Sequence, residues 1–255
     1  MPREIMGWLK EVINEKMSKN LYINQRRDRN VHSLSKSIIR ANSQGRIGVI
    51  AEFKRKSPSG LEGLTSIEEF VQFVSEKEVA GISVVTDEKW FQGSYNDLIK
   101  VSSIQKPVIM KDFILNEKQI DLAYNLGADA VLIIVKLLTE REVKDLISYA
   151  ESYNLEAIVE VHDEDELNLA LDLDSKIIGV NSRNLTDLSI NIDRALELIK
   201  VIPKEKVKIF ESGIKTIDDA DKVAESGANA ILVGTAIMKN LSFLNDLINL
   251  EFRRK

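Results

Sequence analysis

A carboxylate and an ammonium group stand two residues apart where an apolar segment gives way to a polar turn. Glu52 and Lys54 follow Val49–Ala51 and precede the turn Ser57–Gly60. On a β-strand, residues two apart project to the same side, so both charged groups would face one space. Such a pair can transfer protons or hold a charged part of a substrate. The sequence therefore predicts a site where this strand ends.

Apolar segments of strand length recur along the whole chain and alternate with helical patterns. Eight predicted strands span Gly48–Phe53, Gly81–Thr86, Pro107–Lys111, Ala130–Lys136, Ala157–Val161, Ile177–Asn181, Val207–Glu211 and Ala230–Gly234. Their continuous Val, Ile and Leu content is typical of parallel strands that are covered on both faces. Predicted helices lie between them at 67–79, 117–126, 139–153, 163–171, 194–202, 218–226 and 241–252. The alternation predicts an α/β protein, a single (β/α)8 TIM barrel.

Two similar hexapeptides support this barrel. Gly127–Leu132 reads GADAVL, and Gly227–Leu232 reads GANAIL. In each, a left-handed glycine would end a helix and a strand would follow at once. These strands are the fourth and the eighth, half a barrel apart. Duplicated halves and independent helix-to-strand chemistry both fit the pattern.

The segment before the first strand is too apolar to be a linker. Trp8, Leu9, Val12 and Ile13 recur at helical spacing. We therefore expect a single domain over 1–255, with a helical extension at 1–46 and the barrel at 47–255. The basic cluster Arg26–Arg29 fits a solvated face or a local anchor for this extension.

Composition excludes several classes of protein. The 255 residues carry a net charge of −5 and include no cysteine, so a disulfide scaffold, a thiolate metal site and a cysteine nucleophile are ruled out. The two histidines lack metal-ligand spacing, and no Gly-rich nucleotide fingerprint occurs, so we expect no metal and no cofactor. No basic stripe suggests nucleic acid, and no signal or membrane-spanning segment is visible. We expect a cytoplasmic monomer that acts on a small molecule, without nucleic acid or membrane partners.

Polar residues end most of the predicted strands, and in a parallel barrel these ends share one rim. They are Glu52, Lys54, Thr86, Asp87, Lys111, Asp112, Lys136, Glu160, Asn181, Arg183, Glu211, Ser212, Gly234 and Thr235. Lone buried charges are costly, so these groups must be paired or held for a ligand. The Ser-Gly and Gly-Thr loops after the last two strands offer backbone N–H groups that suit a phosphate.

Several residues near this rim have simpler interpretations. One Lys or Glu at a strand end is usually a surface residue, and we expect Lys136 to be structural. We expect His162 to face away from Glu160 and to serve a loop or a helix start. Trp8 and Trp90 are expected to be packing residues.

Five separated segments resemble indole-3-glycerol phosphate synthases, in the order of that family. They are Ile50–Gly60, Met110–Phe113, Glu160–Asp163, Gly179–Leu185 and Glu211–Ile214. The resemblance covers residues 46 to 240 and extends to the helical extension. It implies a cofactor-free enzyme of tryptophan biosynthesis that converts 1-(2-carboxyphenylamino)-1-deoxyribulose 5-phosphate to indole-3-glycerol phosphate, releasing CO2 and water. Thr235 and Ser182 stand where the family often has other residues, which puts phosphate binding only slightly in doubt.

The resemblance also implies roles for the catalytic residues. Lys111 would be the general acid at the substrate carbonyl. Glu160 would stabilise cationic intermediates or take the proton in dehydration. Lys54 would hold the substrate carboxylate and supply the acid for loss of hydroxide. Glu52 would orient these groups and a hydroxyl, and Glu211 would join the catalytic set.

The remaining site residues would bind the substrate. Asn181 and Arg183 would bind its hydroxyls or carboxylate. The phosphate would be held by Ser57, Ser212, Gly213, Gly234 and Thr235. An apolar wall for the aromatic ring would be formed by Phe91, Phe113 and Leu132.

Two other functions stay open from the residues alone. One is a Schiff-base aldolase with Lys111 as the nucleophile. The other is a non-catalytic barrel that binds a sugar phosphate. Phosphoribosylanthranilate isomerase shares this barrel, but the cysteine base of that enzyme has no counterpart here.

Overall fold

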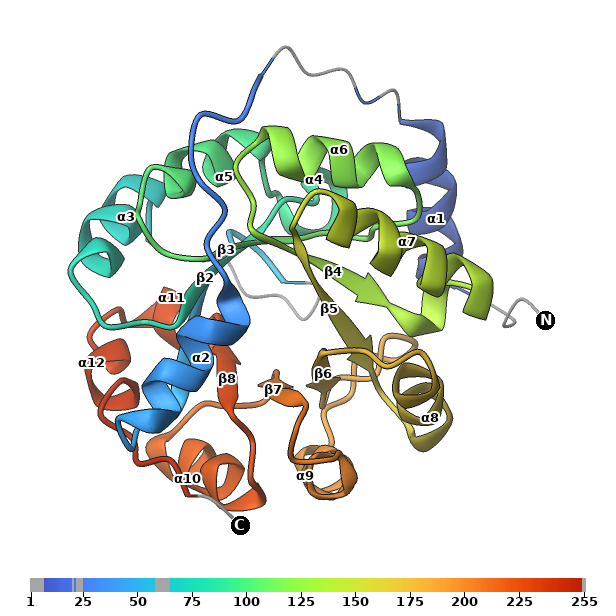
Figure 1. Cartoon of the computed structure of the whole chain (residues 1–255). Helices are drawn as coiled ribbons and strands as arrows, with labels where there is room; N and C mark the ends of the chain where they lie inside the picture. The colour runs from blue at the N-terminus through green and yellow to red at the C-terminus, as the bar shows by residue number, and fades with distance from the viewer. Residues whose placement is uncertain (1–6, 20, 22–24, 58–64, 254–255) are drawn as a thin grey trace.

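The computed structural model describes residues 7–19, 21, 25–57 and 65–253. Within these ranges, eight parallel strands close into a barrel in chain order, and β8 pairs with β1. Figure 1 shows the strands as an inner ring with helices around it. The strands are β1 (Gly48–Phe53), β2 (Gly81–Val85), β3 (Val108–Lys111), β4 (Ala130–Ile134), β5 (Glu156–Val161), β6 (Ile177–Asn181), β7 (Val207–Glu211) and β8 (Ala230–Val233). The predicted (β/α)8 barrel is confirmed.

Helices lie on the outside of the barrel, between successive strands and, for the last two, after β8. They are α3 (Ile67–Ser75), α4 (Glu88–Phe91), α5 (Tyr95–Ser102), α6 (Glu117–Asn125), α7 (Glu140–Ser152), α8 (Glu164–Asp172), α9 (Ile192–Val201), α10 (Ile217–Ser226), α11 (Thr235–Lys239) and α12 (Phe243–Leu247), with a 3-10 turn η1 (Val135–Leu137). Capping boxes at Ser66, Thr139 and Thr216 fix where α3, α7 and α10 begin. No helix in the described part of the chain is long and apolar enough to span a membrane.

The sequence missed some helices and misjudged the length of others. The pattern did not reveal α4 or α5, which are short and begin at the side-chain caps Asp87 and Ser94. The helix predicted over 67–79 ends at Ser75, and the one predicted over 241–252 is reduced to α12. Strand β4 ends at Ile134, because the chain turns into η1 there, so Lys136 lies beyond the strand.

The repeated hexapeptides have the expected structure. Gly127 and Gly227 have φ values of 90° and 92°, and they lead into β4 and β8. This left-handed conformation suits glycine, which has no Cβ to clash. The strands that follow are buried along their whole length, as parallel strands between a filled interior and a helical layer must be.

The N-terminal segment covers both ends of the barrel. Helix α2 (Leu34–Ser43) lies at the end where the strands begin: Asn42 exchanges amide hydrogen bonds with Asn229, just before β8. Ahead of α2, Arg27 and Arg29 form ion pairs with Asp129 at 2.6 and 3.1 Å, so the basic cluster is a local anchor. Helix α1 (Trp8–Ser18) lies at the other end, where the strands finish and where the predicted site must lie.

Candidate active site

A cavity with an empty volume of about 970 Å³, including its open mouth, lies at the carboxyl ends of the strands. All residues of the predicted catalytic and binding sets line it, whereas Thr86 and Lys136 of the predicted rim do not. The catalytic set is Glu52, Lys54, Lys111, Glu160, Asn181 and Glu211, and the binding set is Ser57, Phe91, Phe113, Leu132, Arg183, Ser212, Gly213, Gly234 and Thr235. The remainder of the predicted Ser57–Gly60 turn lies outside the described residues. The structure thus brings these residues together, and their individual roles stay predictions.

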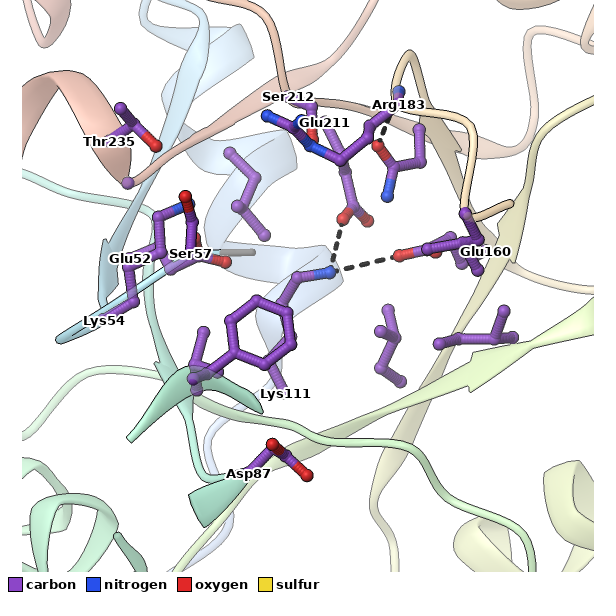
Figure 2. Close-up of a pocket in the computed structure, with 18 of the residues that line it drawn as sticks. Glu52, Lys54, Ser57, Asp87, Lys111, Glu160, Arg183, Glu211, Ser212 and Thr235 are labelled. Carbon is purple, nitrogen blue, oxygen red and sulfur yellow. Dashed lines mark hydrogen bonds and ion pairs between the residues drawn. The ribbon is translucent and has the colours of Figure 1, made fainter. Parts of the chain in front are cut away.

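The Lys111 amine lies at the centre of the cavity between two carboxylates. Its Nζ is 3.1 Å from Glu160 Oε2 and 2.8 Å from Glu211 Oε2, as the dashed lines in Figure 2 show. Together with Glu52, these side chains come from β1, β3, β5 and β7. Layers filled from alternate strands are the usual interior of such barrels. The top layer is here made of charged groups instead of aliphatic ones.

The ionisation states of this layer are set by its members. Burial lowers the pKa of Lys111, but Glu160, Glu211 and Glu52 outweigh it and raise the pKa well above the ordinary value. Burial likewise raises the pKa of Glu160, but Lys111 and His162 outweigh it and hold that carboxyl ionised. Burial and the charge of Glu160 raise the pKa of Glu211 to about 7, against the pull of Lys111. Two carboxyl groups with separated pKa values can serve as proton acceptor and proton donor in one site.

Glu52 and Lys54 form a second charged pair on the opposite side of Lys111 from Glu160 (Figure 2). Lys54 Nζ lies 2.8 Å from Glu52 Oε1, and both side chains line the cavity, as the two-residue spacing predicts. The other oxygen of Glu52 is buried without a hydrogen-bond partner in the described structure. A Cβ at Gly234 would meet the Glu52 carboxylate, so a larger residue at this position would force that carboxylate to shift.

Arg183 brings a further positive charge to the cavity. Its Nη1 donates to the Leu188 carbonyl at 2.9 Å, and its backbone N–H donates to Asn181 Oδ1 at 3.0 Å. Burial lowers the pKa of Arg183, although a guanidinium stays charged at neutral pH. The loop after β6 thus holds Asn181 and Arg183 beside each other at the rim.

The loops after β7 and β8, which the sequence predicts to hold the phosphate, both line the cavity. Ser212 and Gly213 have consecutive positive φ values of 68° and 85°. A serine in this conformation is strained, and such strain is typical of functional loops. Gly234 and Thr235 lie on the next loop, at the start of α11, and Ser57 is buried beside them in the same cavity.

An apolar wall faces these polar groups, and it includes a residue that sequence reasoning assigned to packing. Trp8 of α1 lines the cavity, and its Nε1 donates to the Leu185 carbonyl at 2.9 Å. The Trp8 ring meets Phe113 edge-on, and Phe91 packs against Phe113. The spacing of Trp8 predicts a helix but does not show which residues of that helix enter the cavity.

The expectation that His162 faces away from Glu160 was wrong. Nε2 of His162 lies 3.2 Å from Glu160 Oε1, and Nδ1 lies 2.9 Å from Glu166 Oε2. Residues two apart on an extended chain project to the same side, and His162 follows Glu160 by two. The same rule that joined Glu52 and Lys54 would have found this contact.

Other charged residues near the rim have structural partners. Asp87 and Asp112 bind Lys16 of α1, and Lys136 lies in a small polar pocket beside the main cavity. Across the described residues, no group of three or more His, Asp or Glu side chains is placed to hold a metal ion.

Comparison with known proteins identifies the family of this chain. The family model for indole-3-glycerol phosphate synthase matches residues 2–249. A protein of that name from Sulfurisphaera tokodaii is 49% identical over 249 residues, covering 97% of this chain and all of its own length. A second, from Oceanobacillus iheyensis, is 40% identical and covers 87% of this chain and 85% of its own.

Solved structures with much lower identity share the fold alone. A thiamine phosphate pyrophosphorylase from Pyrococcus furiosus has a TM-score of 0.57 at 14% identity, covering 81% of this chain and 98% of its own. A mandelate oxidase has a TM-score of 0.58 at 17% identity, covering 81% and 70%. The family match and the close relatives, by contrast, extend over nearly the whole sequence. The chain belongs to the indole-3-glycerol phosphate synthase family.

Proposed function

We propose that this chain closes the indole ring in tryptophan biosynthesis. Its substrate is 1-(2-carboxyphenylamino)-1-deoxyribulose 5-phosphate, and its products are indole-3-glycerol phosphate, CO2 and water. The observation that carries the proposal is the position of Lys111, a charged amine between Glu160 and Glu211 in a cavity with one apolar wall. The reaction needs a proton donor, a proton acceptor and an apolar place for an aromatic ring, and this cavity supplies all three.

Ring closure begins when an aromatic carbon attacks the ketone of the ribulose chain. Negative charge develops on the ketone oxygen, and Lys111 donates a proton to it. The two carboxylates keep the amine charged and hold it in place, so no reorganisation is needed during the step. Loss of CO2 then regenerates a neutral ring system.

Dehydration follows and needs an acid and a base. Glu160, held ionised by Lys111 and His162, stabilises the cationic intermediate or accepts the proton. Lys54 holds the substrate carboxylate before decarboxylation and then donates the proton with which the hydroxyl leaves as water, and its pairing with Glu52 fixes its position. Glu211, with a pKa of about 7, exchanges a proton readily near neutral pH.

The two ends of the substrate fit different parts of the cavity. Its aromatic ring lies against Phe91, Phe113, Leu132 and Trp8. Its phosphate lies in the loops after β7 and β8, where Gly213 and Thr235 present backbone N–H groups. Binding the distant phosphate contributes energy that holds the reacting carbons together.

The geometry disfavours a Schiff-base aldolase. A Schiff-base lysine must be a neutral amine, which usually requires a lowered pKa. Lys111 instead has a raised pKa because two carboxylates surround it. Trapping with borohydride and a carbonyl substrate should therefore leave Lys111 unmodified.

The test of the function is direct. The purified protein is mixed with the carboxyphenylamino-deoxyribulose phosphate, and indole fluorescence is followed together with release of CO2. We expect both signals to appear at the same rate. Binding of the substrate without turnover would support the non-catalytic alternative and overturn the proposal.

We also propose that the chain acts as a single-domain monomer in the cytoplasm, with a small molecule as its ligand and neither nucleic acid nor membrane as a partner. The acidic net charge of −5 disfavours nucleic acid. Light scattering on the active protein tests the oligomeric state, and limited proteolysis tests whether the extension at 1–46 separates from the barrel.

A further inference from the structure

A buried imidazole lies between two buried carboxylates behind the catalytic layer. His162 Nε2 lies 3.2 Å from Glu160 Oε1, and His162 Nδ1 lies 2.9 Å from Glu166 Oε2. The His162 side chain is 6% exposed, and those of Glu160 and Glu166 are each 1% exposed. The His162 backbone N–H also donates to Glu166 Oε2, at 2.8 Å. Two contacts to Glu166 of α8, one from the ring and one from the backbone N–H, thus hold His162 in place.

The number of protons in this arrangement is constrained. A neutral imidazole carries one N–H, so its other nitrogen has a lone pair. With carboxylates beside both nitrogens, a neutral ring would point that lone pair at a carboxylate oxygen. An imidazolium donates from Nδ1 to Glu166 Oε2 and forms an ion pair through Nε2 with Glu160 Oε1, which removes this repulsion. The geometry therefore favours a charged ring at the pH at which both carboxyl groups are ionised.

The charges around His162 agree with this assignment. On its own strand it faces Glu160, and Glu166 faces it from α8. A small polar pocket beside the ring is also lined by Lys136, Asp163 and Arg194. Arg194 is paired with Glu164 at 2.9 Å, so part of its charge is neutralised. Only carboxylates are within hydrogen-bond distance of the ring nitrogens in the described structure.

We propose that His162, anchored by Glu166, is a positioning residue that fixes the Glu160 carboxylate and keeps it ionised for the ring-closing reaction. Glu160 Oε2 then faces Lys111, while Oε1 is turned toward the imidazolium. His162 does not line the main cavity, so it acts through Glu160 and not on the substrate. This inference rests on the proposed synthase activity for its catalytic consequence, but the protonation state of His162 can be measured without any substrate.

Nuclear magnetic resonance of the imidazole nitrogens tests the first part. The chain has two histidines, so a His32→Gln variant assigns the signals of His162. We expect both ring nitrogens of His162 to be protonated at pH 7.5. In Glu166→Gln we expect His162 to lose its proton at a clearly lower pH, because one anion has been removed. A neutral His162 at pH 7.5 in the unaltered protein would overturn the inference.

Steady-state kinetics tests the second part. For His162→Gln we expect kcat to fall about 10- to 100-fold, the range for losing a residue that orients a catalytic group. KM should stay within about threefold, because substrate contacts remain. The acid limb of the kcat profile should move to higher pH, since Glu160 loses a neighbouring cation. A structural role alone would not move this limb.

Two further variants complete the design. Glu166→Gln should also lower kcat. If His162→Gln does not fold, this variant tests the positioning role instead. The control is Glu164→Gln on the same helix, whose exposed carboxylate pairs with Arg194 away from the ring. An active unaltered enzyme with unchanged kcat and pH profile in both His162→Gln and Glu166→Gln would overturn the positioning role. No turnover by the unaltered enzyme would instead refute the proposed function, and the resonance experiment would still report on His162.

Discussion

Lys16 Nζ lies 2.6 Å from Asp112 Oδ1, which joins the N-terminal helix to the residue that follows the central lysine of the site. The same amine lies 2.8 Å from Asp87 Oδ2, and all three side chains are almost completely buried. Asp87 lies two residues after β2 and Asp112 directly follows β3, so α1 is held to the rim at two adjacent strand ends. This buried triad places Trp8, one helix length away, over the cavity.

Replacing Lys16 by Met should destabilise the protein strongly. Removing one partner from a buried ionic group leaves the others uncompensated, at a typical cost of about 3–5 kcal/mol. We therefore expect a large loss in the free energy of unfolding, measured with denaturant and followed by circular dichroism. The control is Lys19→Met at the end of the same helix, where the pair with Glu88 is exposed and worth about 1 kcal/mol or less. Equal losses in the two variants would contradict a stabilising triad.

Replacing Lys111 by Ala should remove most of the activity. A positioned general acid contributes about 10²–10⁴-fold to the rate, so kcat should fall by at least about 10²-fold. The measurement is indole fluorescence under substrate saturation. Lys118→Ala, on the outer surface of α6, serves as the control and should retain the unaltered rate. A Lys111→Ala enzyme with normal kcat would remove this residue from the mechanism.

Much of the site follows from simple rules applied to the sequence. The two-residue spacing of Glu52 and Lys54 places both in the cavity, and parallel strands bring Lys111 and Glu211 to the same rim although 100 positions separate them. These rules work because side-chain alternation is set within each strand and all eight strands run in the same direction.

The missing parts depend on contacts that no local pattern encodes. From the sequence alone, Lys16 would be a surface residue of an amphipathic helix. Its burial depends on the position of α1 beside the aspartates that follow β2 and β3. Trp8 reads as a packing residue for the same reason. His162 differs from both, since its position beside Glu160 follows from the spacing rule and was misjudged. The short helix α5 was missed although Leu98 and Val101 stand three residues apart and are both buried on its inner face.

Replacing Glu211 by Gln should stabilise the protein more at pH 8 than at pH 5. The pKa of Glu211 is raised from 4.5 to about 7, mainly by burial. Because the folded state binds this proton more tightly than the unfolded state, the stability it contributes is full below about pH 4.5 and is lost as the pH rises through about 7. Glutamine resembles the protonated form, so the variant should avoid this loss.

The measurement is Tm as a function of pH for both proteins. The Tm values should be similar at pH 5 and should separate in favour of Glu211→Gln at pH 8. Glu205→Gln, on the surface, is the control and should show no separation at either pH. If the difference in Tm between the two proteins instead grew toward acid pH, Glu211 would be ionised more easily in the folded protein than in the unfolded chain.

Replacing Trp8 by Phe should weaken substrate binding and leave the chemical step largely intact. The smaller ring keeps part of the apolar wall, but the hydrogen bond from Nε1 to the Leu185 carbonyl is lost. That bond lies within the protein and mainly holds the ring in place, whereas the smaller ring also loses apolar contact with the substrate, so KM should rise about two- to tenfold while kcat changes less. Trp90→Phe is the matched control, because Trp90 touches Trp8 but does not line the cavity. A fall in kcat at constant KM would show instead that α1 acts on the reacting groups and not on the bound aromatic ring.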